Sequence, residues 1–167
     1  HTRLQGDWSS DVCSSDLDPS PDVSNPVLDT VISHGTVMAG IIGARANNQK
    51  GIVGINHRVS IMPLRVLDGT GAGSTYDVRR AIRYAVENGA DVINLSFTFK
   101  EIDEALMDTI NWAHGQGVVV VTAVGNDGQD LAKEKTYPAC FDELLGQNVI
   151  IGVAATTRED QIGRAHV

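Results

Sequence analysis

Two polar residues in glycine-rich contexts are the first candidates for chemistry in this sequence. His34 lies in the stretch SHGTVMAG (33–40), and Asn126 lies in the stretch AVGNDG (123–128). A histidine titrates near neutral pH, so its imidazole can take up a proton and return it within one reaction. A side-chain amide N–H can stabilise an oxygen that becomes anionic. These residue types are therefore candidates for proton transfer and for hydrogen bonding in an active site.

Each of the two residues also has a purely structural interpretation. His34 can be an ordinary histidine near a helix N-terminus, where the helix dipole disfavours a cation. Asn126, Asp127 and Gly128 are residues typical of a tight turn. Both interpretations can hold at once for Asn126, because loops commonly carry function.

Helical and extended patterns alternate along the chain and predict the elements that position these residues. We expect helices over 33–47, 75–89 and 102–116, and extended segments over 59–67, 90–96, 118–124 and 148–155. The extended segments are nearly continuous apolar runs, which favour an α/β fold: a mostly parallel sheet with helices on both faces. In such sheets ligands bind where loops leave the carboxyl ends of the strands. Asn126 and the stretch SFTF (96–99) each follow one of these ends.

The two ends of the chain do not resemble the rest of it. DWSSDVCSSDL (7–17) is what a common sequencing adapter encodes when it is translated, and IGRAHV (162–167) matches the reverse complement of the adapter's inner end. We therefore assign residues 1–17 and 161–167 to adapter-derived, non-native sequence. Residues 18–160 are then one partial domain, incomplete at both ends.

The composition of residues 18–160 excludes some classes of function. They carry 11 basic and 18 acidic residues, a net charge of −7 against −8 for the whole chain. This acidity argues against nucleic acid or an anionic membrane as the main partner. One cysteine, Cys140, remains, so the sequence indicates no disulfide framework and no cellular compartment.

Four motifs in a fixed order resemble the subtilisin-like serine proteases. HGTVMAG (34–40) resembles the family's H-G-T-x-x-A-G block and GTGAGS (69–74) its substrate-edge loop. DVINLS (91–96) resembles a central strand with the wall of the S1 pocket, and AVGNDG (123–128) the oxyanion block. The resemblance covers nearly all of 29–160. It implies that a Ser/His/Asp triad hydrolyses peptide bonds, with His34 as general base and Asn126 as oxyanion donor.

The resemblance also implies where a peptide or protein substrate binds. In this family the peptide adds as a strand between two edges of the enzyme. The residues that match these edges are Gly71, Ala72 and Gly73 for one and Ser96, Phe97 and Thr98 for the other. Thr98 stands where the family has glycine, a departure that would narrow the S1 pocket or push the peptide outward, and Phe97 is equally compatible with an ordinary core residue. Tyr137–Pro138 falls where the family often has a cis proline.

ANNQKGI (46–52) resembles a calcium loop found in many members of the family. The ligands implied are the side chain of Asn48 and the carbonyl oxygens of Ala46, Lys50 and Ile52. Calcium takes six to eight oxygens, so further ligands would come from elsewhere in the protein. The same residues are also typical of a solvated turn, and both interpretations stay open.

Two members of the triad have no good match in the sequence. The nucleophile block G-T-S-M-A-x-P is absent from the 167 residues and would follow Asp160. VLDT (27–30) imitates the family's D-T/S-G motif, but Asp29 precedes His34 by only five residues and Val31 stands where glycine belongs. We therefore expect a protease fragment that is inactive by itself, with a pro-region as a further partner in the missing N-terminal part. The alternative is a non-catalytic subtilase-like binding or scaffold domain.

A second alternative comes from LRVLDGTGAGSTYDVRRAI (64–82), which has the order strand, glycine loop, helix found in dinucleotide-binding folds. The stretch lacks the third glycine at the expected offset. Asp91, the acidic residue at about the expected distance of twenty residues, begins a strand instead of ending one. The sequence therefore disfavours a dinucleotide site.

Overall fold

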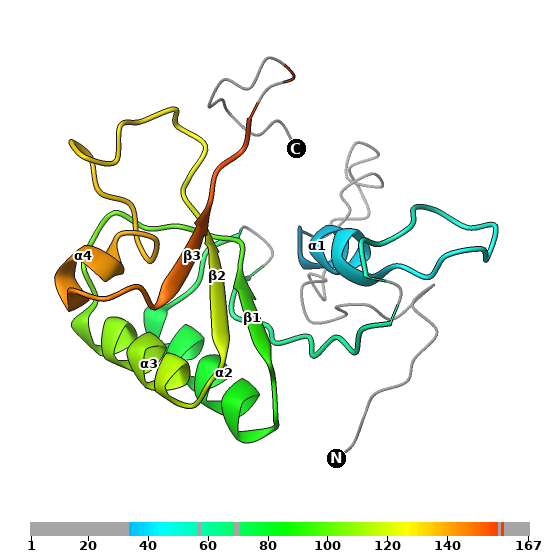
Figure 1. Cartoon of the computed structure of the whole chain (residues 1–167), viewed down its shortest axis with the longest axis horizontal. Coiled ribbons are helices and arrows are strands. Elements are labelled where there is room, and N and C mark those ends of the chain that lie inside the picture. The colour runs from blue at the N-terminus through cyan, green and yellow to red at the C-terminus, as the bar shows by residue number, and fades with distance from the viewer. Residues whose placement is uncertain (1–33, 57, 69–70, 157, 159–167) are drawn as a thin grey trace. The chain divides into compact units, whose positions relative to one another are not determined.

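The computed structural model describes residues 34–56, 58–68, 71–156 and 158 (Figure 1). The chain divides into two compact units, the first ending at Asp77 and the second beginning at Val78. Residues 1–17 and 161–167, which we assigned to the adapter, lie outside the described residues, and so does Asp29.

The first unit contains helix α1 (His34–Gly43), which begins where the sequence predicts and ends four residues before the predicted 47. It ends early because the chain turns back against it. Ile55 N and Asn56 N donate to the carbonyl oxygens of Ile41 and Ile42, each at 2.9 Å. Carbonyls of the last helical turn have no partner within a helix, so the returning chain satisfies them.

Two glycines allow this close return. A Cβ on Gly43 would lie 2.5 Å from Val59 Cγ1. A Cβ on Gly54 would lie 2.3 Å from the backbone nitrogen of Ala44. Neither position can hold a larger side chain without displacing the neighbouring chain.

The extended segment 59–67 is not a regular strand. Residues 59–66 belong to no sheet in the described structure, and Leu67 forms a single antiparallel bridge with Gly73. Its apolar residues pack on α1 instead, where Val59 and Ile61 are the side chains closest to Gly43. Pro63 contributes no backbone N–H to a ladder, which is consistent with this outcome.

The second unit is built on a parallel sheet, as predicted. It contains β1 (Val92–Leu95), β2 (Val119–Ala123) and β3 (Ile150–Val153) in the order β1-β2-β3, all parallel. Helix α3 (Glu104–Gly115) connects β1 to β2, and the short α4 (Phe141–Leu145), which the sequence analysis did not predict, precedes β3. The α/β class and the parallel sheet are therefore confirmed.

Helix α2 (Thr75–Glu87) begins at a side-chain cap. Ser74 Oγ accepts a hydrogen bond from Asp77 N at 3.1 Å and donates to Asp77 Oδ2 at 2.8 Å. Such a cap satisfies a backbone donor that the first helical turn leaves unpaired. The helix buries Val78, Ile82 and Ala85.

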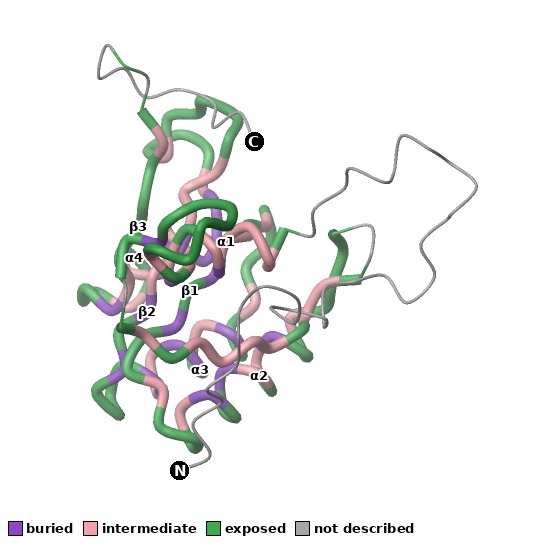
Figure 2. The backbone as a smooth tube through the Cα atoms, turned by 90° about the vertical axis from the view of Figure 1, so that its right-hand side faces the viewer, coloured by how far each residue is buried: buried purple, intermediate pink, exposed green. Residues whose placement is uncertain are grey.

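Helix α3 is fixed in the same way by Asp103, whose Oδ1 accepts from Leu106 N at 2.8 Å. The helix buries Leu106, Ile110 and Ala113 and lies beside α2, where Arg83 stacks over the ring of Trp112 at 5.1 Å. The buried residues of the second unit gather between these helices and the strands (Figure 2). Of the helices described, none is long and apolar enough to cross a bilayer.

Candidate active site

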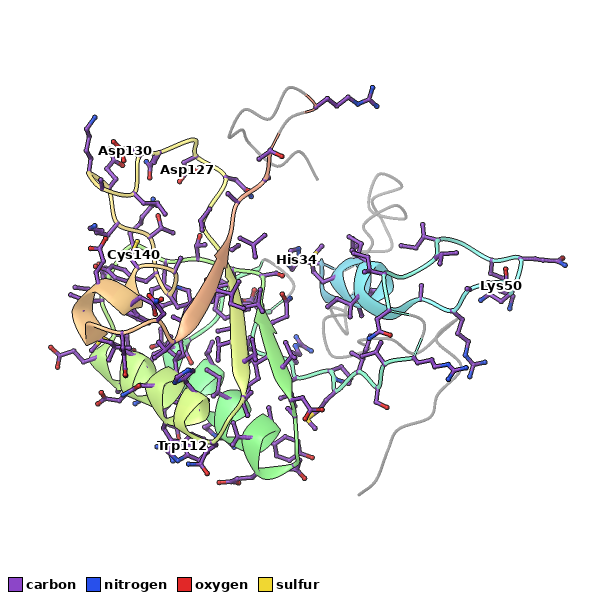
Figure 3. The ribbon with its side chains drawn as sticks, in the orientation of Figure 1. His34, Lys50, Trp112, Asp127, Asp130 and Cys140 are labelled. Atoms are coloured by element: carbon purple, nitrogen blue, oxygen red, sulfur yellow. The ribbon has the colours of Figure 1, made fainter. Side chains whose placement is uncertain are left out.

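His34 is the first residue of α1, and its side chain is exposed (Figure 3). A general base must be reachable by the group whose proton it takes, and an imidazole at a helix start meets this requirement. The histidine belongs to the first unit, and the other predicted residues of that unit lie in the loops between α1 and α2.

Asn126 lies in the loop that leaves the carboxyl end of β2 in the second unit, and it is exposed. Gly125 before it has φ 105°, a backbone conformation that residues other than glycine rarely adopt. Among the described residues, the Asn126 carboxamide has no hydrogen-bond partner. Its N–H groups are therefore available to an acceptor from outside.

The predicted edge residues Ser96, Phe97 and Thr98 follow β1 at the same end of the sheet. Leu95 and Thr122 are register partners in the parallel pair β1·β2, so the loops after β1 and β2 leave the sheet side by side. Ser96 Oγ accepts from Asn94 Nδ2 at 2.7 Å. Ser96 and Phe97 are half-buried, and Thr98 is exposed. The structure thus brings this predicted edge and Asn126 to one end of one sheet.

The other predicted edge, Gly71, Ala72 and Gly73, lies in the first unit and is exposed. It forms one side of a turn in which Asp68 N donates to Ala72 O at 2.7 Å and Ala72 N donates to Asp68 Oδ1 at 3.0 Å. A Cβ on Gly73 would lie 2.1 Å from the carbonyl oxygen of Val66, so this position accepts glycine alone.

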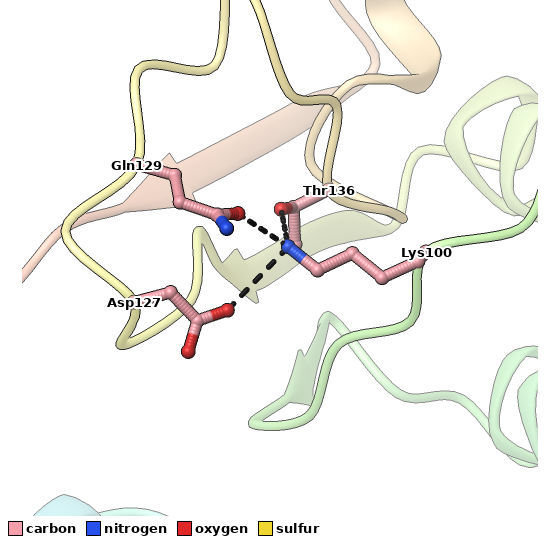
Figure 4. Close-up of polar contacts among 4 residues, drawn as sticks. All are labelled: Lys100, Asp127, Gln129 and Thr136. Atoms are coloured by element: carbon pink, nitrogen blue, oxygen red, sulfur yellow. Dashed lines mark hydrogen bonds and ion pairs between the residues drawn. The ribbon is translucent and has the colours of Figure 1, made fainter.

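Lys100 was not a candidate in the sequence analysis, yet it joins the loops after β1 and β2 (Figure 4). Its ammonium group donates to Gln129 Oε1 at 2.6 Å and to Thr136 Oγ1 at 3.2 Å, and it pairs with Asp127 Oδ2 at 3.4 Å. Its partners lie 27 to 36 residues further along the chain, so neither motif nor spacing could reveal the cluster. The signal that the sequence did carry is a cation directly after SFTF, at the carboxyl end of a predicted strand.

Phe99, the residue before Lys100, makes a second connection to the same loop. Phe99 and Tyr137 exchange two backbone hydrogen bonds of 2.9 Å each, and their rings are 6.3 Å apart. Phe141 packs against Tyr137 at 5.0 Å. The Tyr137–Pro138 bond is cis, as the resemblance predicts.

A small cavity of about 30 Å³ lies behind the loop that carries Asn126. Its lining includes Gly125, Asp127 and Gln129 together with Thr136 and Ala154. This volume suits a single water molecule.

The predicted calcium loop 46–52 projects from the end of α1, where Gly54 N donates to Ala44 O at 2.9 Å. Asn47, Gln49 and Gly51 have φ values of 59°, 60° and 55°. Left-handed backbone at a residue such as Gln49 costs of order 1–3 kcal/mol, and such residues cluster where loops hold ligands. Asn48 Oδ1 accepts from Lys50 N at 3.1 Å and keeps a second lone pair for a cation.

No cluster of three His, Cys, Asp or Glu side chains that could hold a metal occurs in the part of the chain that the structure describes. A cation in the 46–52 loop would therefore rely on neutral oxygens from Asn48 and the carbonyls of Ala46, Lys50 and Ile52. Calcium accepts such neutral oxygen ligands, so these residues fit part of its coordination shell.

Comparison with known sequences matches residues 2–165 to the Subtilase family. The chain belongs to the subtilase family. It is 36% identical over 140 residues to a "Thermophilic serine proteinase" of Bacillus sp. (strain AK1), a match that covers 84% of this chain and 32% of the relative. It is 39% identical over 127 residues to thermitase of Thermoactinomyces vulgaris, covering 76% of this chain and 42% of that protein.

Membership of the subtilase family removes the dinucleotide alternative, which the structure also disfavours. Asp91 directly precedes β1, and residues 59–66 before the glycine loop form no strand. The matches cover 32% and 42% of the two relatives, so this subtilase chain spans about a third to two fifths of their length.

Proposed function

We propose that this subtilase chain is a segment of a serine endopeptidase, with His34 as the general base and Asn126 as the oxyanion donor. The observation that carries the proposal is the state of Asn126. It is exposed, it follows the carboxyl end of a parallel strand, and its carboxamide has no partner among the described residues. A donor that must bind a transient oxyanion has to be held in place and left unpaired in the resting protein.

The proposed chemistry divides between these two side chains. The imidazole of His34 takes the proton of a serine hydroxyl as the oxygen attacks the peptide carbonyl, and it later gives that proton to the leaving amine. The Asn126 amide donates to the carbonyl oxygen while that oxygen carries negative charge. The backbone of the exposed residues 71–73 and that of 96–98, where Thr98 is exposed, are the proposed hydrogen-bonding edges for an extended peptide or protein substrate.

We further propose that the 167-residue chain alone does not hydrolyse peptides, because a triad needs its serine. None of Ser20, Ser24, Ser33, Ser60, Ser74 and Ser96 lies in a nucleophile block, so the serine and the triad acid belong to sequence outside 18–160. A sequencing read across both junctions of the source DNA gives the uninterrupted gene.

The test is peptide hydrolysis by the product of that gene. With a peptide p-nitroanilide, His34→Ala should lower kcat by at least about 10⁴-fold. Asn126→Ala should lower kcat by about 10²–10³-fold with little change in KM, which is the range established for one such donor in a subtilisin. His114→Ala, a change at an exposed histidine in the last turn of α3, should leave both constants unchanged.

The outcomes separate the proposal from its alternative. Full-length protein that binds peptides but has another residue in place of the serine would be a non-catalytic binding or scaffold domain. Turnover by the purified 167-residue chain that disappears on His34→Ala would refute our assignment of the serine and the acid to other sequence.

We also propose that the 46–52 loop supplies calcium ligands in the full-length protein. The left-handed residues of the loop and the Asn48 oxygen support this proposal. In calorimetric titration of EDTA-treated protein with CaCl₂, Asn48→Ala should weaken one binding event at least about tenfold, since even outer-shell partners contribute that much. Asn56→Ala removes a similar side-chain turn contact, to Arg58 N, outside the loop and serves as the control. Unchanged calcium binding in Asn48→Ala would exclude the loop.

A further inference from the structure

We propose that Lys100 is a positioning residue for the oxyanion donor Asn126. This inference rests on the proposed function, since it assigns to Lys100 a role in the same reaction. Lys100 follows the predicted substrate edge 96–98 and makes its contacts with the loop that carries Asn126 (Figure 4).

The contacts of Lys100 are two hydrogen bonds and one ion pair. A lysine ammonium has three N–H donors and no acceptor. Asp127, Gln129 and Thr136 supply three acceptors, at 3.4, 2.6 and 3.2 Å. An ammonium held by two hydrogen bonds and one ion pair to the protein itself is suited to holding a loop in place, and less to recruiting a substrate anion.

The contacts of Lys100 can affect the placement of Asn126 because of where Asn126 lies in the loop. Asp127, its immediate neighbour, is one of the three acceptors, and Gly125 on its other side is a glycine at φ 105°. Val124 N donates a hydrogen bond to Val153 O at 3.1 Å, and Tyr137 shares two backbone hydrogen bonds with Phe99. Between these two anchors, among the described residues, two lysines make side-chain contacts that join the loop to the rest of the second unit: Lys135 pairs with Glu143 at the far end, and Lys100 contacts Asp127 and Gln129 close to Asn126. The backbone at Asn126 is therefore held on one side by strand pairing and on the other by Lys100.

Lys100 and its partner Asp127 are exposed, so their loss should affect catalysis more than it affects the free energy of unfolding. The side chains of Lys100 and Asp127 are 52% and 62% exposed, and ion pairs with this exposure contribute little to the free energy of unfolding. A catalytic donor is far more sensitive, because a displacement of about 1 Å can lower the rate about 100-fold. Loss of Lys100 should therefore slow the reaction while the protein stays folded.

The experiment compares variants of the full-length protein in the peptide p-nitroanilide assay. Lys100→Met keeps the length of the side chain and removes its charge and donors, and it should lower kcat about tenfold with KM changed less than about twofold. Lys100→Arg keeps the charge and should recover part of the loss. Lys133→Met is the matched control, because Lys133 lies in the same loop, is 81% exposed and pairs with Asp130 within the loop. It should behave as wild type, and all variants should unfold at the same urea concentration.

A double-mutant cycle tests whether Lys100 acts through Asn126. In the Asn126→Ala background, Lys100→Met should not lower kcat any further, because the amide that Lys100 positions is absent. An equal loss in both backgrounds would overturn the proposal, as would an unchanged kcat in Lys100→Met or an effect confined to KM. If Lys100→Met does not fold, Asp127→Asn replaces it in the same cycle with the same expectation.

The cycle also distinguishes this inference from the proposed function. A full-length protein without peptidase activity, or an Asn126→Ala variant as fast as wild type, refutes the proposed function and this inference with it. If Asn126→Ala lowers kcat strongly and Lys100→Met leaves it unchanged, only the proposed role of Lys100 is refuted.

Discussion

At the scale of single residues, Lys135 shows how a charge pair fixes the far end of the loop that carries Asn126. Its ammonium lies 2.6 Å from Glu143 Oε2 and donates a hydrogen bond to Glu143 Oε1 at 2.7 Å, and Glu143 belongs to the first turn of α4. This hydrogen bond raises the pKa of Lys135 above its usual 10.5, and the nearby negative charge of Glu143 adds to the effect, while desolvation opposes it. The raised pKa means that the pair stabilises the fold fully below pH 10.5 and that this contribution is lost as the pH rises through the pKa in the folded protein.

Glu143→Gln should lower the pKa of Lys135, because a neutral amide stabilises an ammonium less than a carboxylate does. The measurement is an NMR titration of ¹³Cε-labelled lysine in full-length protein carrying His34→Ala, which prevents self-digestion. Glu134→Gln changes a neighbouring exposed carboxylate and should leave the pKa of Lys135 unchanged. A Lys135 midpoint at or below 10.5 in the parent protein would show that the pair is not formed in solution.

The short motifs around His34 and Asn126 made them candidates through their resemblance to the family's blocks, since each residue type alone is equally compatible with a structural role. They could not predict the role of Lys100, because its acceptors are distant in sequence and become neighbours only when β1 and β2 pair. The same holds for Phe99 and Tyr137, which the fold joins by two backbone hydrogen bonds.

At the scale of elements, the predictions held where local signals and packing agree. Helix α2 has an apolar stripe and a Ser74 cap, and α3 has an Asp103 cap and a glycine, Gly117 at φ 84°, after its end. Both lie within two residues of their predicted bounds. The strand runs in 90–96, 118–124 and 148–155 likewise contain β1, β2 and β3.

The elements that the sequence misplaced are those decided by tertiary contacts. The run 59–67 is apolar enough for a strand, but in the structure it packs on the glycines of α1. Helix α1 stops at Gly43 because the returning chain takes its last carbonyls. Helix α4 has five residues, too few for a helical period to show in the sequence, and it forms around the fully buried Phe141.

At the scale of the whole molecule, the sheet of the second unit has two unlike faces. Ile93, Leu95 and Val120 are buried together with Thr122, whereas alternate residues on the same strands are exposed. The register places the exposed large apolar residues of the strands on one face, and they are Val92 at 58%, Val119 at 41%, Ile151 at 54% and Val153 at 52%. Contiguous apolar surface of this kind marks an interaction face or a liability for aggregation.

The exposed face gives a prediction for the 167-residue chain expressed alone. It should bind the dye ANS and unfold without a sharp thermal transition, because four large apolar side chains lie open to water on one sheet. Full-length protein should bind less dye, because the matches cover 32% and 42% of the two relatives and a chain of their length has further residues that can pack on this face. Replacing both Val119 and Ile151 by threonine keeps β-branched residues in the strands and should reduce the dye fluorescence of the isolated chain. If the isolated chain is a monomer in sedimentation, unfolds cooperatively and does not bind ANS, this face is instead covered within the chain itself.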